Sequence, residues 1–362
     1  MSVYPRNTLH ISAWPDADRV LWETMLSEGD ILDGRGAGAD WAPSTRENTR
    51  AAYGRWLNWL TLNQLLDPAE MPLDRMTPEH IRAYVPDQQL SAASSTVSQY
   101  VLDLLRFALA ADRGRDWQWL RRVQGRLASR TTPFRDKAPK IRAAEDLFRL
   151  GLELMDASGN ACRRYSRHAH YVQYRDGLII ALLAARPLRL KNLTAIVIGQ
   201  HLVKVDTVYW LRFDADEVKN RKPIDVPLPP ELGPYLDTYL STHRPPLLAG
   251  RSSNRLWILI NGDGMQAKTI YYRVTRRTKR AFGASISPHL FRDCAATSIA
   301  IQDPEHVRMA ATLLGHHSLT TTQKYYDQSR MLAAGRHYQS TVTAMRDGIR
   351  LNNSNHPRTS ET

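Results

Sequence analysis

Hydrophobic and polar positions in the first third of the chain alternate with the period of an α-helix. Apolar residues recur with that spacing from Tyr53 to Leu60, behind a capping box in which Ser44 is the N-cap and Glu47 follows three residues later. Further helices are predicted to begin at Thr77, ahead of Pro78, at Ser94 or Ser95, and at Trp117. No strand pattern interrupts them. Residues 41–130 are therefore predicted to form a small helical bundle.

The pattern becomes mixed after a polar, proline-containing stretch at 131–142. Helical spacing returns over 144–157, over 170–185 and from 267 almost to 349, whereas short alternating runs predict strands at 196–205, 209–213, 224–227 and 256–260. A small antiparallel sheet embedded in helices is an α+β arrangement. The predicted fold class is thus mainly α with a small antiparallel β-sheet.

These patterns divide the 362 residues into five parts. They are an N-terminal arm at 1–40, a helical domain at 41–130, a basic linker at 131–142, an α+β domain at 143–350, and a polar, disordered tail at 351–362. The length itself fits roughly two domains. The linker is either simply solvated or suited to lie along a polyanion.

Several classes of protein are excluded by what the chain lacks. Its longest apolar run, 177–185, is far shorter than the roughly 20 residues of a membrane helix, and no secretory signal is visible. The two cysteines, Cys162 and Cys294, match no metal-ligand spacing and suggest no disulfide framework. We therefore expect a protein of the reducing cytoplasm, without a membrane partner or a metal site.

Charge narrows the choice of partner. The chain has 49 Lys and Arg against 36 Asp and Glu, a formal net charge of +13. This surplus favours a polyanion, most commonly nucleic acid, although a basic surface kept for solubility is the alternative. The charge is concentrated at 113–142 and 268–280, as a protein gripping a duplex from two sides would need. Candidate DNA-binding residues are Arg121, Arg122, Arg126, Arg135, Lys137, Lys140, Arg273, Arg276, Arg277 and Arg280.

Four short segments carry residues suited to chemistry. They are RPLRLKNL with Arg189, EVKNRKPIDVPL with Lys219, SPHLFRDCAATSIA with His289 and Arg292, and LLGHHSLTTTQKYYDQ with His316 and Tyr325. The third begins a helix at Ser287–Pro288, so that its His and Arg, at i and i+3, share one face. Each segment alone is better explained by a surface charge, a helix cap or a core aromatic than by chemistry.

Together and in this order, the four segments resemble the tyrosine recombinase (phage integrase) family. The C-terminal domain of that family carries Arg, Lys, His-x-x-Arg, a His or Trp, and then Tyr. The resemblance covers residues 41–350 and implies a helical core-binding domain, a linker and an α+β tyrosine-recombinase catalytic domain. The C-terminal motifs are specific, whereas the N-terminal part is similar only in helical character and basicity.

The residue types suit cleavage of a phosphodiester without water or metal, which needs a nucleophile, charge stabilisation and an acid for the leaving oxygen. Tyr325 is the candidate nucleophile, with an unperturbed pKa near 10 that also makes it a moderate leaving group. Arg189 and Arg292 offer forked, permanently charged donors to the two non-bridging oxygens. The expected product is a 3′-phosphotyrosine, and because the bond energy is retained, no ATP or other cofactor is implied.

The remaining three candidates, Lys219, His289 and His316, are suited to proton transfer or hydrogen bonding. The resemblance assigns Lys219 to the departing 5′ oxygen. His289 can exchange a proton with Tyr325, and His316 can donate to a phosphate oxygen. The implied partners are double-stranded DNA with inverted-repeat sites and three further copies of the chain, a homo-tetramer that recombines paired sites through a Holliday junction, with room for accessory DNA-bending or recombinase proteins.

The chain departs from the family pattern at several places. Pro187-Leu188 replaces the usual glycine context, and Asn192 stands where an acidic residue is usual. Asp293 follows Arg292, where many members have histidine. Tyr326 and His317 are weaker rivals of their neighbours, because motif spacing favours Tyr325 and His316.

Three other functions were weighed. A type IB topoisomerase uses a similar residue set, but the Leu-Gly-His…Tyr context favours a recombinase. A non-catalytic DNA-binding protein of this fold would be expected to have lost some of the six positions, and all six are filled. A metallonuclease needs a carboxylate cluster, which does not accompany these residues.

Overall fold

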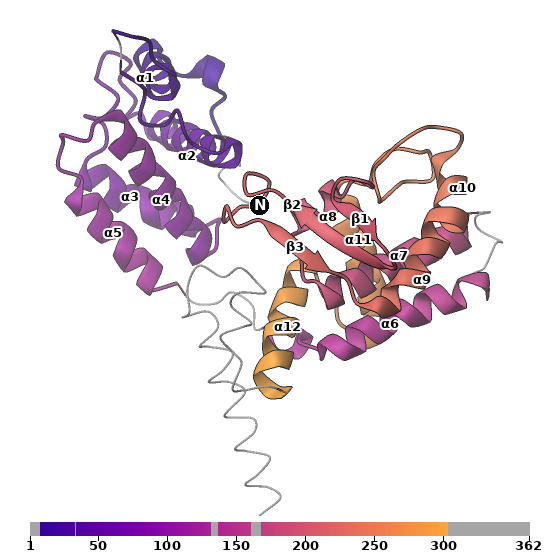
Figure 1. The fold of residues 1–362 in the computed structure, drawn as a ribbon. Helices are drawn as coiled ribbons and strands as arrows, with labels where there is room; N and C mark the ends of the chain where they lie inside the picture. Colours follow the sequence, from indigo (N-terminus) through magenta and orange to yellow (C-terminus); the bar gives the residue numbers. More distant parts are fainter. Residues whose placement is uncertain (1–7, 33, 132–136, 161–167, 303–362) are drawn as a thin grey trace, which may run out of the picture. The chain divides into compact units, whose positions relative to one another are not determined.

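A computed structural model describes residues 8–32, 34–131, 137–160 and 168–302. The chain divides into two compact units, Met1–Asp136 and Lys137–Thr362 (Figure 1). Their boundary falls inside the stretch predicted as a linker. No helix in the described ranges is both long and apolar enough to cross a membrane. The predicted tail at 351–362 and the helical pattern at 303–349 lie outside the described residues.

Helices make up the regular structure of the first unit wherever it is described. They are the 3-10 helix η1 (Ile11–Ala13), α1 (Asp16–Leu26), α2 (Pro43–Leu62), α3 (Pro78–Gln89), α4 (Ser94–Ala111) and α5 (Gln118–Ser129). As predicted, Thr77 caps α3, because its hydroxyl accepts a hydrogen bond from the His80 N–H at 3.1 Å. The predicted capping box of α2 does not form, because Pro43 already begins the helix and Glu47 binds Arg50 at 2.8 Å.

The predicted N-terminal arm contributes to the core of this unit. Trp22 from α1 stacks on Phe107 of α4, and Tyr53 of α2 stacks on the same ring with centroids 3.7 Å apart. Asp18, wholly buried, accepts a hydrogen bond from the Tyr53 hydroxyl and pairs with buried Arg75 at 3.0 Å. Residues before the predicted boundary at 40 are thus held by the same packing and charges as the bundle.

The second unit is the predicted small antiparallel sheet among helices (Figure 1). Its elements are η2 (Ala138–Lys140), α6 (Ala144–Asp156), η3 (Ala157–Asn160), α7 (Ala169–Ala185), α8 (Leu190–Ala195), β1 (Leu202–Val205), β2 (Val208–Phe213), β3 (Ile224–Pro227), η4 (Pro230–Leu232), α9 (Gly233–Thr238), the π-helix η5 (Tyr239–His243), α10 (Arg244–Leu248), α11 (Ala267–Phe282) and α12 (Pro288–Gln302). The strand order is β1-β2-β3, with Leu202 opposite Leu211 and Phe213 opposite Ile224.

Two strand predictions in this unit were wrong in extent. The predicted strand at 196–205 begins only at Leu202, because the chain turns at Gly199, whose φ of +83° suits glycine. The run at 256–260 forms one isolated bridge, from Ile258 to Gly264, rather than a strand. Its apolar character reflects burial, since Leu256 and Trp257 lie in the core.

Helix α7 is the centre of the second core. Residues 178–183 are wholly buried, which explains why the helix is apolar on all sides. Helices α6 and α7 approach closely at Gly151 and Gly177, where a Cβ on Gly151 would stand 2.6 Å from the Ala181 nitrogen. The end of α7 leads directly to Arg189, so the tightly packed helix sets the start of the site.

Candidate active site

Arg189 stands at the junction between two helices of the second unit. It is the N-cap residue of α8, three residues after the extended Arg186 that ends α7. The half-buried side chain donates from Nη1 to Asn220 Oδ1 at 3.4 Å. Asn192 on α8 also donates to the carbonyl of Glu217 at 3.3 Å. Both bonds tie α8 to the turn between β2 and β3.

Lys219 lies on that turn, which is fixed to the protein on both of its sides. Val218 is buried in the core beside it, whereas the Lys219 side chain is exposed. Glu217 accepts hydrogen bonds from the His201 ring at 2.8 Å and from the Asp214 N–H at 2.9 Å. The bond from His201 holds the pKa of Glu217 below its usual value. The turn therefore has an anchored base and a long cationic side chain that reaches solvent.

Helix α12 carries the His-x-x-Arg motif and begins at Pro288, as predicted. Arg292 is buried, and its Nη1 donates to the carbonyl of Pro187 at 2.7 Å. That carbonyl lies two residues before Arg189, so α12 and the α7–α8 junction bring both guanidinium groups to one place. Burial, and then the charge of Arg189, lower the pKa of Arg292 to about 10. Two cations held together in a desolvated setting favour a bound oxyanion.

His289 is exposed one turn before Arg292, but surrounding protein atoms still desolvate its ring. This desolvation lowers the pKa of His289, and the nearby charges of Lys137, Arg292 and Arg189 act in the same direction. Asp293 opposes them. Since the unperturbed pKa is already near 6.5, the imidazole is neutral at pH 7 and can accept a proton.

The candidates in the fourth motif, His316 and Tyr325, lie outside the described residues, as do His317 and Tyr326. Arg189, Lys219, His289 and Arg292 are described, and they come from three places in the sequence. Arg292 binds the backbone of Pro187, two residues before Arg189, and the charge of Arg189 acts on it. The Lys219 turn adjoins Arg189 through Asn220.

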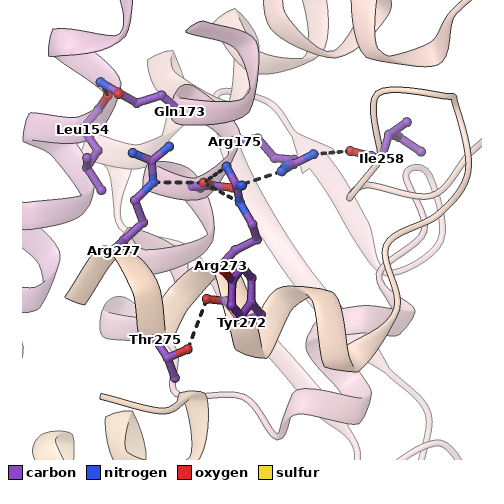
Figure 2. Close-up of polar contacts among 9 residues, drawn as sticks. Leu154, Gln173, Arg175, Ile258, Tyr272, Arg273, Thr275 and Arg277 are labelled. Atoms are coloured by element: carbon purple, nitrogen blue, oxygen red, sulfur yellow. Dashed lines mark hydrogen bonds and ion pairs between the residues drawn. The ribbon is translucent and has the colours of Figure 1, made fainter. Parts of the chain in front are cut away.

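The basic residues of α11 are divided between two environments. Arg273 binds Asp176 of α7 through Nε at 2.9 Å and Nη2 at 2.6 Å, and Arg277 binds the same carboxylate at 3.0 Å (Figure 2). Arg276 and Arg280 are exposed. Two of the four arginines predicted on α11 to contact DNA are therefore engaged with a carboxylate of their own domain.

Asp176 is almost wholly buried and is shared by three arginines. Arg175, its neighbour on α7, pairs with Oδ1 at 3.1 Å and also donates to the Ile258 carbonyl at 2.6 Å (Figure 2). Burial by itself raises the pKa of Asp176, but the arginines outweigh it and hold the pKa below its usual value. The carboxylate is ionised and ties α7 to α11.

The remaining predicted DNA-binding residues are spread over both units. On α5, Arg121 is exposed, while Arg122 and Arg126 line a groove whose other walls include apolar residues of α3 and α5. Lys140 is half-buried at the end of η2. Arg135 lies outside the described residues. Lys137 pairs with Asp293 at 2.9 Å, which brings it to the candidate site.

Sequence reasoning did not assign three groups to this site, although it named Lys137 as a candidate DNA contact. The Pro187 carbonyl, the Lys137 ammonium and the Asp293 carboxylate all adjoin the His-x-x-Arg motif. A signal existed only for Asp293, which departs from the family pattern next to Arg292. In the described part of the chain, no group of three or more His, Cys, Asp or Glu side chains is arranged to hold a metal ion.

Comparison with known proteins places this site in a family. The model of the phage integrase family matches residues 156–331, a stretch that holds all four motif segments. The family model and the relatives support assignment of the chain to the tyrosine recombinases.

Relatives include three proteins called tyrosine recombinase XerD. That of Pseudomonas aeruginosa is 32% identical over 152 residues, 42% of this chain and 49% of the relative. That of Ralstonia nicotianae is 35% identical over 106 residues, 29% and 34% of the two chains. That of Staphylococcus haemolyticus is 26% identical over 293 residues, 78% and 89%. The chain thus spans about half or less of the first two relatives and most of the third.

Two solved structures of the XerH site-specific recombinase share the fold. The post-cleavage complex with palindromic difH substrate has a TM-score of 0.55 and 15% identity, over 82% of this chain and 79% of that one. The pre-cleavage complex with difH has a TM-score of 0.54 and 17% identity, over 81% and 78%. At these identities the likeness concerns the fold alone.

Proposed function

We propose that the protein is a site-specific DNA recombinase that cleaves and rejoins strands through a 3′-phosphotyrosine intermediate. The observation that carries this proposal is the proximity of Arg189 to Arg292, which binds the carbonyl two residues before Arg189, beside the Lys219 turn. Family membership and the DNA substrates bound by the XerH structures support it.

The arginine pair accounts for transition-state stabilisation. Forked donors from two helices can hold the two non-bridging oxygens of one phosphate, and a permanent charge suits the developing negative charge. The lowered pKa of Arg292 reflects the cost of holding it desolvated beside another cation. A phosphate relieves that repulsion, and the two guanidinium groups favour the charged, penta-coordinate state of the reacting phosphate.

The other residues supply the nucleophile and move protons. Tyr325 attacks the phosphorus, its phenolic proton passes to the neutral His289, and Lys219 protonates the departing 5′ oxygen. His316 donates a hydrogen bond to a phosphate oxygen. The DNA strand is then joined to the tyrosine through a 3′-phosphate, and attack by a 5′ hydroxyl reverses the step. Neither metal nor ATP takes part in this scheme.

The same scheme implies an assembly. Four copies of the chain act on two paired sites with inverted repeats and exchange strands through a Holliday junction, in integration, excision, transposition or resolution of a mobile element. Exposed Arg276 and Arg280 of α11 and Arg121 of α5 are the proposed contacts to DNA phosphates.

Covalent capture tests the proposal. A nicked suicide substrate should trap the wild-type chain as a protein–DNA adduct, with EDTA present and no nucleotide. Tyr325→Phe should abolish the adduct and leave DNA binding intact, because loss of one hydroxyl changes packing little. Tyr326→Phe is the matched control and should retain capture, since the motif spacing favours Tyr325 as the nucleophile. An adduct mapped to Tyr326, or formation that requires Mg²⁺, would contradict the proposal.

A further inference from the structure

The segment that leads into the second unit is fastened along the helix that bears His289 and Arg292. Three successive contacts join 137–144 to α12. They are Lys137 Nζ to Asp293 Oδ2 at 2.9 Å, the Arg142 N–H to Cys294 Sγ at 3.4 Å, and the Ala144 N–H to Ser298 Oγ at 2.8 Å. The first of these is an ion pair, and it is the one nearest the candidate catalytic residues.

Asp293 is placed to act on His289 electrostatically. It follows His289 by four residues on α12, a spacing that puts both side chains on one face of the helix. Its side chain is only 8% exposed, whereas that of Lys137 is 56% exposed. A buried carboxylate close to an imidazole favours the imidazolium strongly, unless a cation neutralises it. Lys137 supplies such a cation.

The charges that face His289 come from three segments. Asp293 and Arg292 belong to α12, Arg189 precedes α8, and Lys137 precedes η2. Asp293 raises the pKa of His289, and the three cations lower it. Arg189 and Arg292 are needed for phosphate binding in the proposed mechanism, so the Lys137–Asp293 pair is the part of this environment that can vary without loss of the phosphate site.

We propose that Lys137 and Asp293 form a positioning pair, which holds segment 137–144 against the catalytic helix and balances the charge that His289 faces. The catalytic meaning of the pair rests on the proposed function, in which His289 takes the proton of Tyr325. The pair is a feature of this chain, because the resemblance puts histidine after the motif arginine in many members of the family.

The proposal predicts that substitutions of Lys137 and of Asp293 shift the pKa of His289 in opposite directions. Lys137→Gln removes the ammonium that pairs with Asp293 and that lowers the pKa of His289, so that pKa should rise. Asp293→Asn removes the group that favours the imidazolium, so the pKa should fall. The double variant should lie between the two single variants, and Lys137→Arg should match the wild type.

The measurement is an NMR titration of the histidine rings in the full-length protein. The His289 signal is assigned by its loss in His289→Gln. Lys140→Gln, which removes the same charge three residues along the segment, is the control and should leave the titration midpoint unchanged. Thermal unfolding of each variant identifies any that does not fold. If Asp293→Asn fails to fold, the comparison of Lys137→Gln with Lys137→Arg tests whether the charge of Lys137 affects the pKa of His289.

A second readout is the rate of adduct formation on the suicide substrate as a function of pH. Because the imidazolium cannot accept a proton, the acidic limb of the profile should follow the His289 titration in each variant. Shifts of the same sign in both single variants, or none in either, would overturn the pair. A Lys137→Gln protein with weakened DNA binding and an unmoved midpoint would instead assign Lys137 to a DNA phosphate. If the wild-type protein forms no adduct, but the two single variants shift the His289 midpoint in opposite directions, only the proposed function is contradicted.

Discussion

The Arg292 guanidinium is held by the carbonyl oxygen of Pro187, a residue 105 positions earlier in the chain. The sequence could predict that His289 and Arg292 share a helical face, because that relation depends only on a spacing of three residues. It could not predict the carbonyl partner, because every residue has a backbone carbonyl and residue type does not show which one accepts the hydrogen bond. Of the candidate site, sequence therefore predicts the chemistry of the side chains, but not what fixes them.

The proposed role of Lys219 as the general acid follows from its exposed side chain and from its place on the turn between β2 and β3. Since the side chain reaches solvent from an anchored base, it can approach the leaving oxygen without moving the phosphate site. We expect Lys219→Ala to slow cleavage of ordinary DNA at least about 100-fold. A substrate with sulfur in place of the scissile 5′ oxygen leaves without protonation and should restore the rate.

The comparison with Arg292→Ala makes this test specific. The arginine acts on the non-bridging oxygens, so the sulfur substrate should not rescue its loss. Single-turnover cleavage of both substrates by both variants gives the four rates needed. Equal rescue of the two variants, or rescue of neither, would show that Lys219 is not the acid.

At the scale of elements, the long described helices were predicted, the short helices α8, α9 and α10 were not, and two strands were predicted with the wrong extent. Long amphipathic stretches such as α4 and α11 can be recognised from the helical period of their apolar residues. The strand predicted from residue 196 instead starts late, because the chain turns at Gly199 before β1. The contact between α7 and α11 had no signal at all, because Asp176 and Arg273 lie 97 residues apart. Charges placed by such a contact look like surface charges in the sequence.

The Asp176 contact gives a prediction about stability. Asp176→Ala leaves the arginines of α7 and α11 without their shared carboxylate, and unpaired buried charge typically costs about 3–5 kcal/mol. Denaturant unfolding of the full-length protein should show a loss of this size. Asp225→Ala is the control, because Asp225 pairs with Arg212 at the surface, and such pairs contribute about 0–1 kcal/mol. A loss below about 1 kcal/mol for Asp176→Ala would contradict the role assigned to the carboxylate.

For the molecule as a whole, composition predicted the kind of partner more reliably than the points of contact. The net charge of +13 indicates a polyanion, but it does not say which cations face outward. Four arginines share one basic run in the sequence, at 273, 276, 277 and 280. In the fold, Arg273 and Arg277 bind Asp176. Arg276 and Arg280 are exposed.

This separation predicts the salt dependence of DNA binding. Each phosphate contact that is lost should reduce the slope of log affinity against log salt by about 0.9. Arg276→Ala combined with Arg280→Ala should therefore flatten the slope by nearly two. Arg251→Ala removes a cation that pairs with Asp263 at the surface and should leave the slope unchanged. An unaltered slope in the double variant would remove α11 from the proposed DNA interface.

The buried Asp18–Arg75 pair bears on how the protein is to be shortened for study. A fragment trimmed to begin at residue 41 keeps the predicted bundle but removes Asp18, the acceptor of the Tyr53 hydroxyl and the counter-ion of Arg75. It also strips Trp22 from the face of Phe107 and opens the core to water. The smallest self-contained form of the first unit therefore includes α1, although a cut at the bundle boundary would appear harmless from the sequence alone.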